Sequence, residues 1–221
     1  MAVPLAVVVV QQQASDIRLL HCGVDSKYLI EKKRPNYEAK RLIFVGRLVE
    51  CKGLDKLLHA WSEVLADKHY VLDIVGDGEL KEALIIWSRR LGLEGQVNFL
   101  GPKSHNWLRA NVHYYSAMVA PFQIGADGTR DTGPLVLKEA MALALPVITT
   151  NLPGCLEIVD DRCALMCQHG DAYALTQALN RFALLSPKQR ELLGKNGRRR
   201  VQQRFHGDKQ AQHLSNWIQA L

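Results

Sequence analysis

Two positively charged residues, Arg47 and Lys52, each have a glycine beside them: Gly46 precedes Arg47, and Gly53 follows Lys52. Paired cations near a helix start suit a diphosphate, because charge-assisted hydrogen bonds to phosphate oxygens are among the strongest in proteins. Ordinary loop charge is the alternative interpretation. The adjacent glycines favour the anion site, since glycine lets a phosphate approach the backbone closely.

A second group of residues with chemical potential lies further along the chain. Glycines and an acid precede an apolar helix that we expect over 134–145: Gly125, Gly128, Asp131 and Gly133. Pro134 is preorganised for a first helical turn, and the free N–H groups there form an anion site with the helix dipole.

Glu139 lies on that same helix, about 9 Å from its start at 1.5 Å per residue. A carboxylate on so apolar a helix needs a partner. Two ribose hydroxyls would satisfy it, because a carboxylate accepts hydrogen bonds on both oxygens. A buried salt bridge is the alternative.

The elements that must position these groups follow a regular alternation. We expect strands at 42–45, 71–75, 97–100, 117–120, 147–150 and 164–167, with helices at 54–65, 80–91, 104–111 and 134–145 and a helical tail. Alternating strands and helices imply a parallel sheet covered on both faces. In the doubly wound order 3-2-1-4-5-6, strands one and four are neighbours, and ligands bind at their carboxyl ends. Both groups of residues follow these two strands.

Composition narrows the class of protein. The chain has 221 residues, of which 48% are hydrophobic and 23% charged, with a net charge of +6. These values fit one soluble α/β domain with decorations and exclude disorder, collagen and coiled coil. The basic excess suits anionic partners. No apolar run reaches the length of a membrane span.

The cysteines argue against disulfides and metal. Their number is odd: Cys22, Cys51, Cys155, Cys163 and Cys167. Cys163 and Cys167 with His169 do not complete a zinc site, and no Asp-x-Asp motif appears in the setting that a diphosphate–metal site requires. We expect no obligatory metal and a reducing, cytoplasmic location.

The tail is strongly basic. Its cations are Lys188, Arg190, Lys195, Arg198, Arg199, Arg200 and Arg204. They predict either a solvated helix face or a peripheral contact with an anionic membrane at its inner face. Without interleaved aromatic residues, nucleic acid is disfavoured as a partner. A final apolar stripe, which must pack on something, comprises Leu214, Trp217, Ile218 and Leu221.

One glycine-rich segment is not a dinucleotide motif. Gly76-Asp77-Gly78 follows the second strand rather than the first and lacks the third glycine of G-x-G-x-x-G. We interpret it as a tight turn from strand to helix.

Five segments in register carry a resemblance to a known family. They are Phe44-Val45-Gly46-Arg47-Leu48 with Lys52-Gly53, Ile74-Val75-Gly76-Asp77-Gly78, Phe99-Leu100-Gly101, Leu137-Lys138-Glu139-Ala140-Met141-Ala142 and Leu145-Pro146-Val147-Ile148. From about Ile17 to its end, the chain resembles the C-terminal, donor-binding domain of the retaining glycosyltransferases of family four, also called glycosyl transferases group 1, which have the GT-B architecture.

The resemblance implies roles for the residues above. Arg47 and Lys52 would grip the diphosphate of a UDP-, GDP- or ADP-sugar, Glu139 the ribose, and Asp131 the transferred hexose. Asp131 stands where the family usually has Glu. Backbone contacts would come from Gly46, from Gly101, Pro102 and Lys103, and from Thr132, Gly133, Pro134, Leu135 and Val136. The acceptor would be a glycan or a lipid-linked glycan, as in polysaccharide biosynthesis.

The resemblance also predicts domain organisation. We expect residues 1–38, including the strand-like Val7–Val10, to be the remainder of an N-terminal domain and its linker, and 39–221 to be the Rossmann-like domain with crossing C-terminal helices. The acceptor-binding domain, about 160 to 200 residues by ordinary domain size, would be supplied by a partner or by self-association, and this chain alone would be inactive. The alternatives are a non-catalytic nucleotide-sugar-binding module and an unrelated Rossmann protein such as an epimerase.

Overall fold

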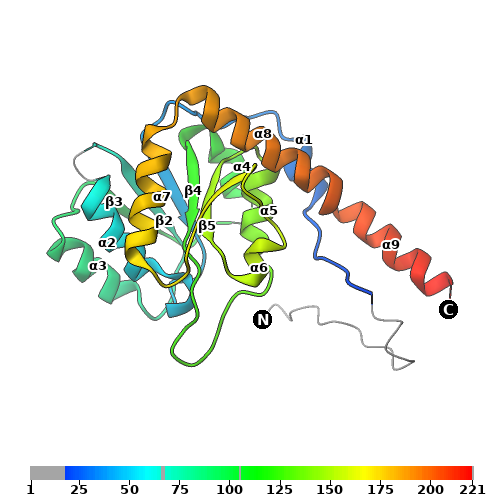
Figure 1. Cartoon of the computed structure of the whole chain (residues 1–221), viewed down its shortest axis with the longest axis horizontal. Helices are drawn as coiled ribbons and strands as arrows, with labels where there is room; N and C mark the ends of the chain where they lie inside the picture. Colours follow the sequence, from blue (N-terminus) through cyan, green and yellow to red (C-terminus); the bar gives the residue numbers. More distant parts are fainter. Residues whose placement is uncertain (1–17, 66–67, 105, 221) are drawn as a thin grey trace.

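The strands of the described chain form one parallel sheet in the order β3-β2-β1-β4-β5-β6, as the sequence predicts. The computed structural model describes residues 18–65, 68–104 and 106–220 (Figure 1). The strands are β1 (Arg41–Val45), β2 (Val71–Val75), β3 (Val97–Gly101), β4 (Ala117–Ala120), β5 (Val147–Thr150) and β6 (Ala164–Cys167). The order reverses between β1 and β4, which pair through Leu42 with Ala117 and Ile43 with Met118.

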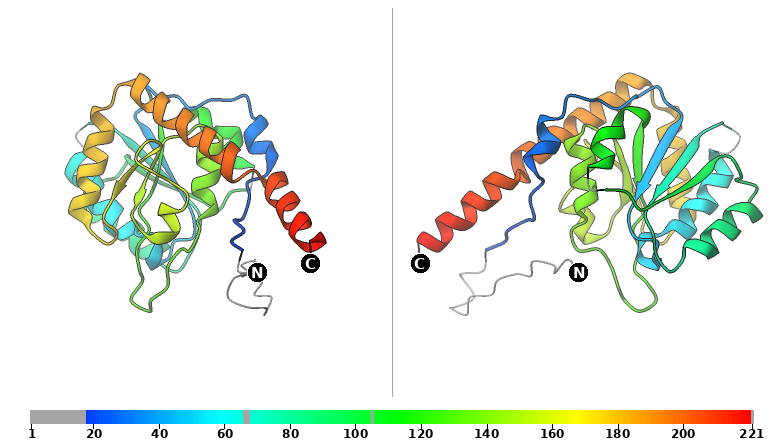
Figure 2. Two further views of the ribbon diagram at one scale, coloured as in Figure 1. Left: turned by 45° about the vertical axis from the view of Figure 1, so that its right-hand side comes forward. Right: turned by 180° about the vertical axis from the view of Figure 1, so that it is seen from behind.

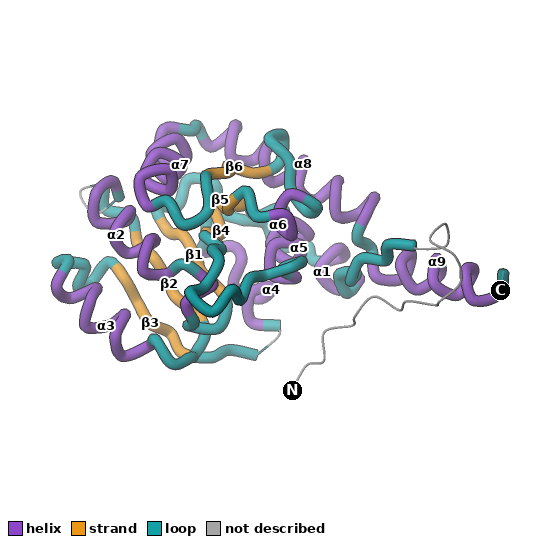
Figure 3. Tube along the Cα trace, turned by 60° about the horizontal axis from the view of Figure 1, so that its bottom comes forward, coloured by secondary structure: helices purple, strands orange, loops and turns teal. Residues whose placement is uncertain are grey.

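Helices cover both faces of the sheet, and Figure 3 shows the strands running between the two sets. Leu42 and Phe44 pack with α2 (Leu54–Val64), α3 (Lys81–Arg90) and α7 (Ala172–Leu184). Ile43, on the opposite face, joins a core with α1 (Ser26–Ile30), α4 (Trp107–Asn111), α5 (Leu135–Ala142), α6 (Pro153–Leu156) and α8 (Pro187–Arg204). Side chains of a strand alternate between faces, so strands apolar at successive positions require this double cover.

Helix α8 is fixed to the domain by part of the basic stretch. Arg190 is 5% exposed and donates hydrogen bonds to the Tyr70 hydroxyl at 2.8 Å and the Tyr37 carbonyl at 3.1 Å. Arg198 donates to the carbonyls of Ala142 and Leu29, and Arg200 reaches the Ile158 carbonyl and Asp160. These three arginines bind groups within the domain. Fewer positive charges of α8 therefore face solvent or a membrane than the sequence predicts.

Helix α9 (Gly207–Gln219) extends away from the body, and residues 18–25 run beside it (Figures 1 and 2). It has no buried residue. Among the described residues, the apolar stripe of this helix lacks the expected packing, since Leu214 and Ile218 are exposed. The Arg18 guanidinium lies over the Trp217 ring, with its carbon 5.6 Å from the ring centroid. Leu221 and the strand expected at Val7–Val10 lie outside the described residues.

The segment before β1 packs into this domain. Val24 donates a backbone hydrogen bond to Phe205 at 2.8 Å and accepts one from Gly207 at 3.0 Å. A Cβ on Gly23 would lie 2.4 Å from the Gly207 Cα, so only glycine allows this crossing. Val24, Tyr28 and Leu29, from the described part of this segment, are buried in the core.

Two local expectations need correction. The helix expected from Pro134 begins at Leu135, and Pro134 is its N-cap in an extended conformation, with ψ 112°. The same helix ends at Ala142 because the chain turns at Ala144, whose φ is 61°.

Cys22 is exposed while the other cysteines are buried, and all are free thiols. Among the described residues, we find no helix with the length and hydrophobicity needed to cross a bilayer.

Candidate functional site

The loops that follow β1 and β4 are locked together. Gly53, with φ 67°, begins α2 so close to β4 that a Cβ there would lie 2.0 Å from the Pro121 carbonyl oxygen. Gln123 donates its backbone N–H to Cys51 at 2.9 Å and its side-chain amide to the Glu50 carbonyl at 2.8 Å. The switch point of the sheet is therefore held by backbone contacts as well as side chains.

This arrangement brings Lys52 against Asp131. The short 3-10 turn Glu50–Lys52 places Lys52 so that its Nζ lies 2.8 Å and 3.0 Å from the two carboxylate oxygens of Asp131. The side chains are 13% and 21% exposed, respectively, and the ammonium also lies 4.9 Å from the centroid of the Phe122 ring. The structure thus joins two of the sequence-predicted site residues in a half-buried ion pair.

Asp131 is supported from behind by α6 and β5. A Cβ on Gly154 would lie 2.8 Å from the Asp131 carbonyl oxygen, so the helix packs directly on that backbone. Thr150 donates its hydroxyl to the Phe122 carbonyl at 2.7 Å. The loop between β4 and α5, which Figure 1 shows extending from the body, is therefore anchored where it carries the acid.

The loop that carries Arg47 is braced by the Gly76-Asp77-Gly78 turn. Leu48 donates its N–H to the Asp77 carbonyl at 2.9 Å. A Cβ on Gly76 would lie 1.8 Å from the Gly46 carbonyl oxygen, and one on Gly78 would lie 2.5 Å from that of Leu48. The turn has the structural role that the sequence indicates, and Arg47 is exposed on the braced loop.

The start of α5 is open to solvent. Thr132 and Gly133 are exposed, and nothing in the described chain lies within 4 Å of a Cβ added to Gly133. Leu135 and Val136 are half-buried in the first turn, which has no side-chain cap. Unsatisfied N–H groups at a helix start are an anion-binding feature, and here they follow Asp131 directly.

A hollow of about 90 Å³ lies at the carboxyl ends of the strands beside α5. Its lining comprises Tyr28, Val45, Val75, Lys103, Ser104, Trp107, Leu108 and Glu139. Two of these, Glu139 and Lys103, are predicted from the sequence, and the structure brings them to the same hollow. Gly101, next to it, has φ 68°, and its carbonyl accepts the Gly76 N–H at 3.0 Å, while Pro102 is exposed.

Sequence reasoning missed three polar or aromatic members of this lining. Ser104 and Trp107 follow Lys103 closely, so their proximity to the predicted base-binding loop was a usable signal. Tyr28 gave no such signal, because it lies in the segment interpreted as a linker. Burial raises the pKa of Tyr28 well above its usual value, and the charge of Glu139 and a hydrogen bond to that carboxylate raise it further.

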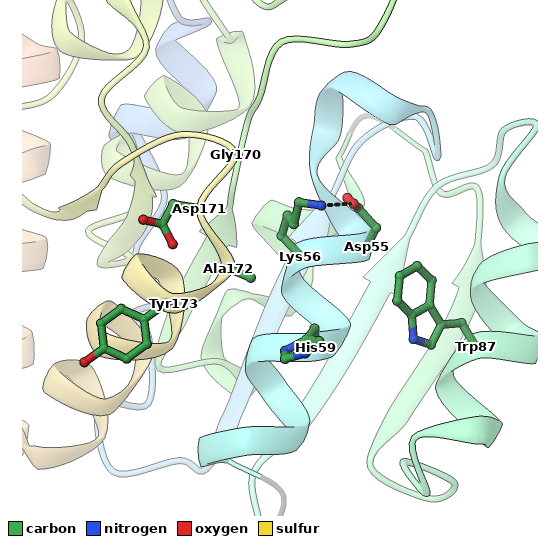
Figure 4. Close-up of a pocket in the computed structure, with 8 residues that line it drawn as sticks. All are labelled: Asp55, Lys56, His59, Trp87, Gly170, Asp171, Ala172 and Tyr173. Atoms are coloured by element: carbon green, nitrogen blue, oxygen red, sulfur yellow. Dashed lines mark ion pairs between the residues drawn. The ribbon is translucent and has the colours of Figure 1, made fainter.

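A larger hollow of about 510 Å³ lies elsewhere, over α2 between α3 and the start of α7 (Figure 4). None of the predicted site residues lines it. Its charged groups have partners: Asp55 pairs with Lys56 at 2.9 Å, and Asp171 caps α7 by accepting the Ala174 N–H at 2.9 Å. The cations and the open helix start instead favour the switch point as the functional site.

The site is built from cations and backbone donors. Within the described residues, no group of three or more His, Cys, Asp or Glu side chains is arranged to hold a metal ion. The half-buried pair Lys52–Asp131 offers one cation and one carboxylate, and the helix start offers N–H donors. Such a set can bind a phosphorylated ligand and stabilise negative charge that develops on it.

The fold and the site identify this protein as a Rossmann-like α/β domain whose cations lie at the switch point of the sheet. The model of the family described as glycosyl transferases group 1 matches residues 25–200. The chain therefore belongs to the group 1 glycosyltransferases, and the described domain is of their GT-B type.

Individual relatives agree with this assignment. The chain is 29% identical over 182 residues to a putative colanic acid biosynthesis glycosyltransferase, WcaL of Escherichia coli, covering 81% of this chain and 45% of that protein. The chain thus spans less than half the length of this relative.

Solved structures show the same fold. Sucrose-phosphate synthase of Thermosynechococcus elongatus superposes with a TM-score of 0.78 at 24% identity, over 92% of this chain and 52% of that one. HepE of Anabaena, solved in complex with UDP and glucose, gives 0.79 at 18% identity, over 96% and 59%.

Proposed function

We propose that this chain is the donor-binding domain of a retaining glycosyltransferase that takes a hexose from a nucleoside diphosphate sugar. The observation that carries the proposal is the pairing of Lys52 with Asp131 at the switch point, 2.8 Å apart and beside the open start of α5. In the proposed site, Arg47, Lys52 and the N–H groups of Gly133, Leu135 and Val136 hold the diphosphate, and Asp131 contacts the sugar.

The nucleoside occupies the hollow beside α5. Glu139 accepts hydrogen bonds from the ribose hydroxyls, and the backbone of Gly101, Pro102 and Lys103 contacts the base. UDP, GDP and ADP are the candidate nucleotides, and UDP is the one present in the HepE complex. Cations and backbone dipoles stabilise the leaving diphosphate in this proposal, so it requires no obligatory metal.

The acceptor is a glycan or a lipid-linked glycan in polysaccharide assembly, a proposal supported by the function named for the E. coli relative. Transfer needs an acceptor hydroxyl held against the sugar, and such positioning can contribute about 7–11 kcal/mol. We propose that a second, N-terminal type of domain supplies it, either in a partner or by self-association. The exposed stripe of α9 is suited to that contact. The reaction would occur in the cytoplasm, with the remaining basic surface of α8 touching an anionic membrane.

Calorimetry with UDP, GDP and ADP tests the proposal. One of the three should bind with micromolar to millimolar affinity, about −8 to −4 kcal/mol. Arg47→Ala should weaken that binding by roughly 1.5–3 kcal/mol, the range for a hydrogen bond to a charged group. Arg89→Ala is the matched control. It also removes one exposed arginine, but Arg89 is in the last turn of α3, where it lies 3.9 Å from Glu94 and is not one of the proposed site residues. Failure of all three nucleotides to bind would contradict the proposal.

A further inference from the structure

We infer that Tyr28 is a positioning residue of the nucleotide site, fixing the Glu139 carboxylate through its phenol so that the segment entering the domain completes the ribose pocket. The inference rests on the proposed function, because it requires that Glu139 bind the ribose of the proposed nucleotide. It adds a residue outside the predicted site and a selectivity that the residue controls.

Tyr28 and Glu139 lie on the same hollow from different elements. Tyr28 is on α1 and 6% exposed, and Glu139 is half-buried on α5. Both line the cavity of about 90 Å³, and the Glu139 carboxylate is near enough to raise the pKa of the phenol through its charge and a hydrogen bond. An ionised carboxylate only accepts, so the Tyr28 hydroxyl is the donor.

Helix α5 also contacts the segment that precedes α1. Lys138, adjacent to Glu139, is 2% exposed and donates from its Nζ to the Cys22 carbonyl at 2.9 Å. Its ammonium also lies 4.9 Å from the Phe205 ring centroid. Consecutive residues of one helix therefore hold both ends of the segment from Cys22 to Tyr28.

The start of α1 is fixed as well. Asp25 is its N-cap and accepts the Lys27 N–H at 2.8 Å. Capping fixes the first turn of a helix. Because α1 has only five residues, Tyr28 lies within that fixed turn. The phenol consequently approaches Glu139 from a determined direction.

The consequence concerns the ribose. A carboxylate has about four acceptor positions, so one phenol hydrogen bond leaves enough for two ribose hydroxyls. A binding group held by a neighbour in one orientation is preorganised and loses less freedom on binding. Without the phenol donor, Glu139 should lose orientation and distinguish poorly between a ribonucleotide and its 2′-deoxy analogue.

The experiment compares Tyr28→Phe with the unaltered chain. Calorimetry measures the Kd of the nucleoside diphosphate that binds best among UDP, GDP and ADP, and of its 2′-deoxy form. The unaltered chain should prefer the ribonucleotide by roughly 10- to 150-fold, the value of one hydrogen bond to a charged group. Tyr28→Phe should weaken ribonucleotide binding and bring this preference close to 1.

Two further variants separate positioning from structure. Tyr37→Phe is the matched control, because Tyr37 lies in the same segment and donates to the Ala144 carbonyl at 3.0 Å, outside the hollow's lining. It should leave the preference unchanged. In a Glu139→Gln background, Tyr28→Phe should have little additional effect, since residues that act through one another are not additive.

The outcomes are distinguishable. A preference that Tyr28→Phe leaves intact, or equal weakening of both nucleotides together with a lower melting temperature, would overturn the inference while the proposed function stands. Binding of none of the three ribonucleotides by the unaltered chain would overturn the proposed function and this inference with it. Loss of the preference with an unchanged melting temperature supports the inference.

Discussion

Lys52 and Asp131 form a bidentate ion pair, with the ammonium nitrogen 2.8 Å and 3.0 Å from the two carboxylate oxygens. The two residues are far apart in sequence and come from the loops after β1 and β4. The cation proposed to grip the diphosphate is therefore already engaged by the acid proposed to contact the sugar. A bound diphosphate must share Lys52 with Asp131 or displace it.

Asp131→Asn should consequently tighten binding of the nucleoside diphosphate while Lys52→Ala weakens it. Loss of the carboxylate removes a competitor for Lys52. Even a solvent-exposed ion pair is worth about 0.2–1 kcal/mol, so the affinity gained on loss of this half-buried pair should be about fivefold. Calorimetry with UDP, GDP or ADP measures it. Glu191→Gln, which disrupts the exposed pair with Lys195 on α8, is the control. Weaker binding by Asp131→Asn would show that the acid organises Lys52 instead of competing for it.

The stability of the domain should depend on Asp160 at acidic pH. A hydrogen bond from Arg162, with a further contribution from Arg200, lowers the pKa of Asp160 to about 2 from the model-compound value of 3.8. A depressed folded-state pKa stabilises the fold above the unfolded value and loses that contribution as pH falls from about 4 to 2.

Urea unfolding at pH 7 and pH 3 measures this contribution. Asp160→Asn should lower the free energy of unfolding at pH 7, by under about 1 kcal/mol for so exposed a carboxylate, and the difference from the unaltered chain should shrink at pH 3. Asp161→Asn, the exposed neighbour, should change neither value. A difference that stays constant with pH would show that Asp160 acts through packing and not through its charge.

One thiol should react much faster than the others. Cys22 is exposed and the other four cysteines, Cys51 included, are buried. Burial raises the pKa of Cys155 and Cys163 to about 11 and that of Cys167 to about 12. The thiolate is the reactive form, so iodoacetamide at pH 8 should label one site per folded chain. Mass spectrometry locates it, and Cys22→Ser should remove the fast phase. Rapid labelling of several sites would mean that the core opens readily.

The sequence by itself determined the sheet and the part of the site at its switch point, where Lys52 and Asp131 lie. Short apolar runs separated by amphipathic helices specify a doubly covered parallel sheet, since only that arrangement buries both faces of each strand. The order of the strands then fixes which loops meet, which is why Lys52 and Asp131 could be assigned to one region before their distance was known. These are local patterns combined with a topological rule.

Tertiary structure decided what each charge does. The basic stretch near Arg190 and Arg198 carries the same residue types as a solvated helix, yet both side chains donate to backbone carbonyls inside the domain. Charge and helical spacing do not encode the partner across the fold, because that partner is a carbonyl that every residue possesses.

The same limit applies to the ends of the described chain. Tyr28 and Glu139 line one hollow although they are distant in sequence, and Lys138 and a pair of glycines, Gly23 and Gly207, hold the segment before Tyr28 in place. The exposed stripe of α9 is the converse case: its periodicity predicted a helix correctly, but whether that face is covered depends on surfaces far from it in sequence. Local periodicity determines an element, and long-range packing determines its neighbours.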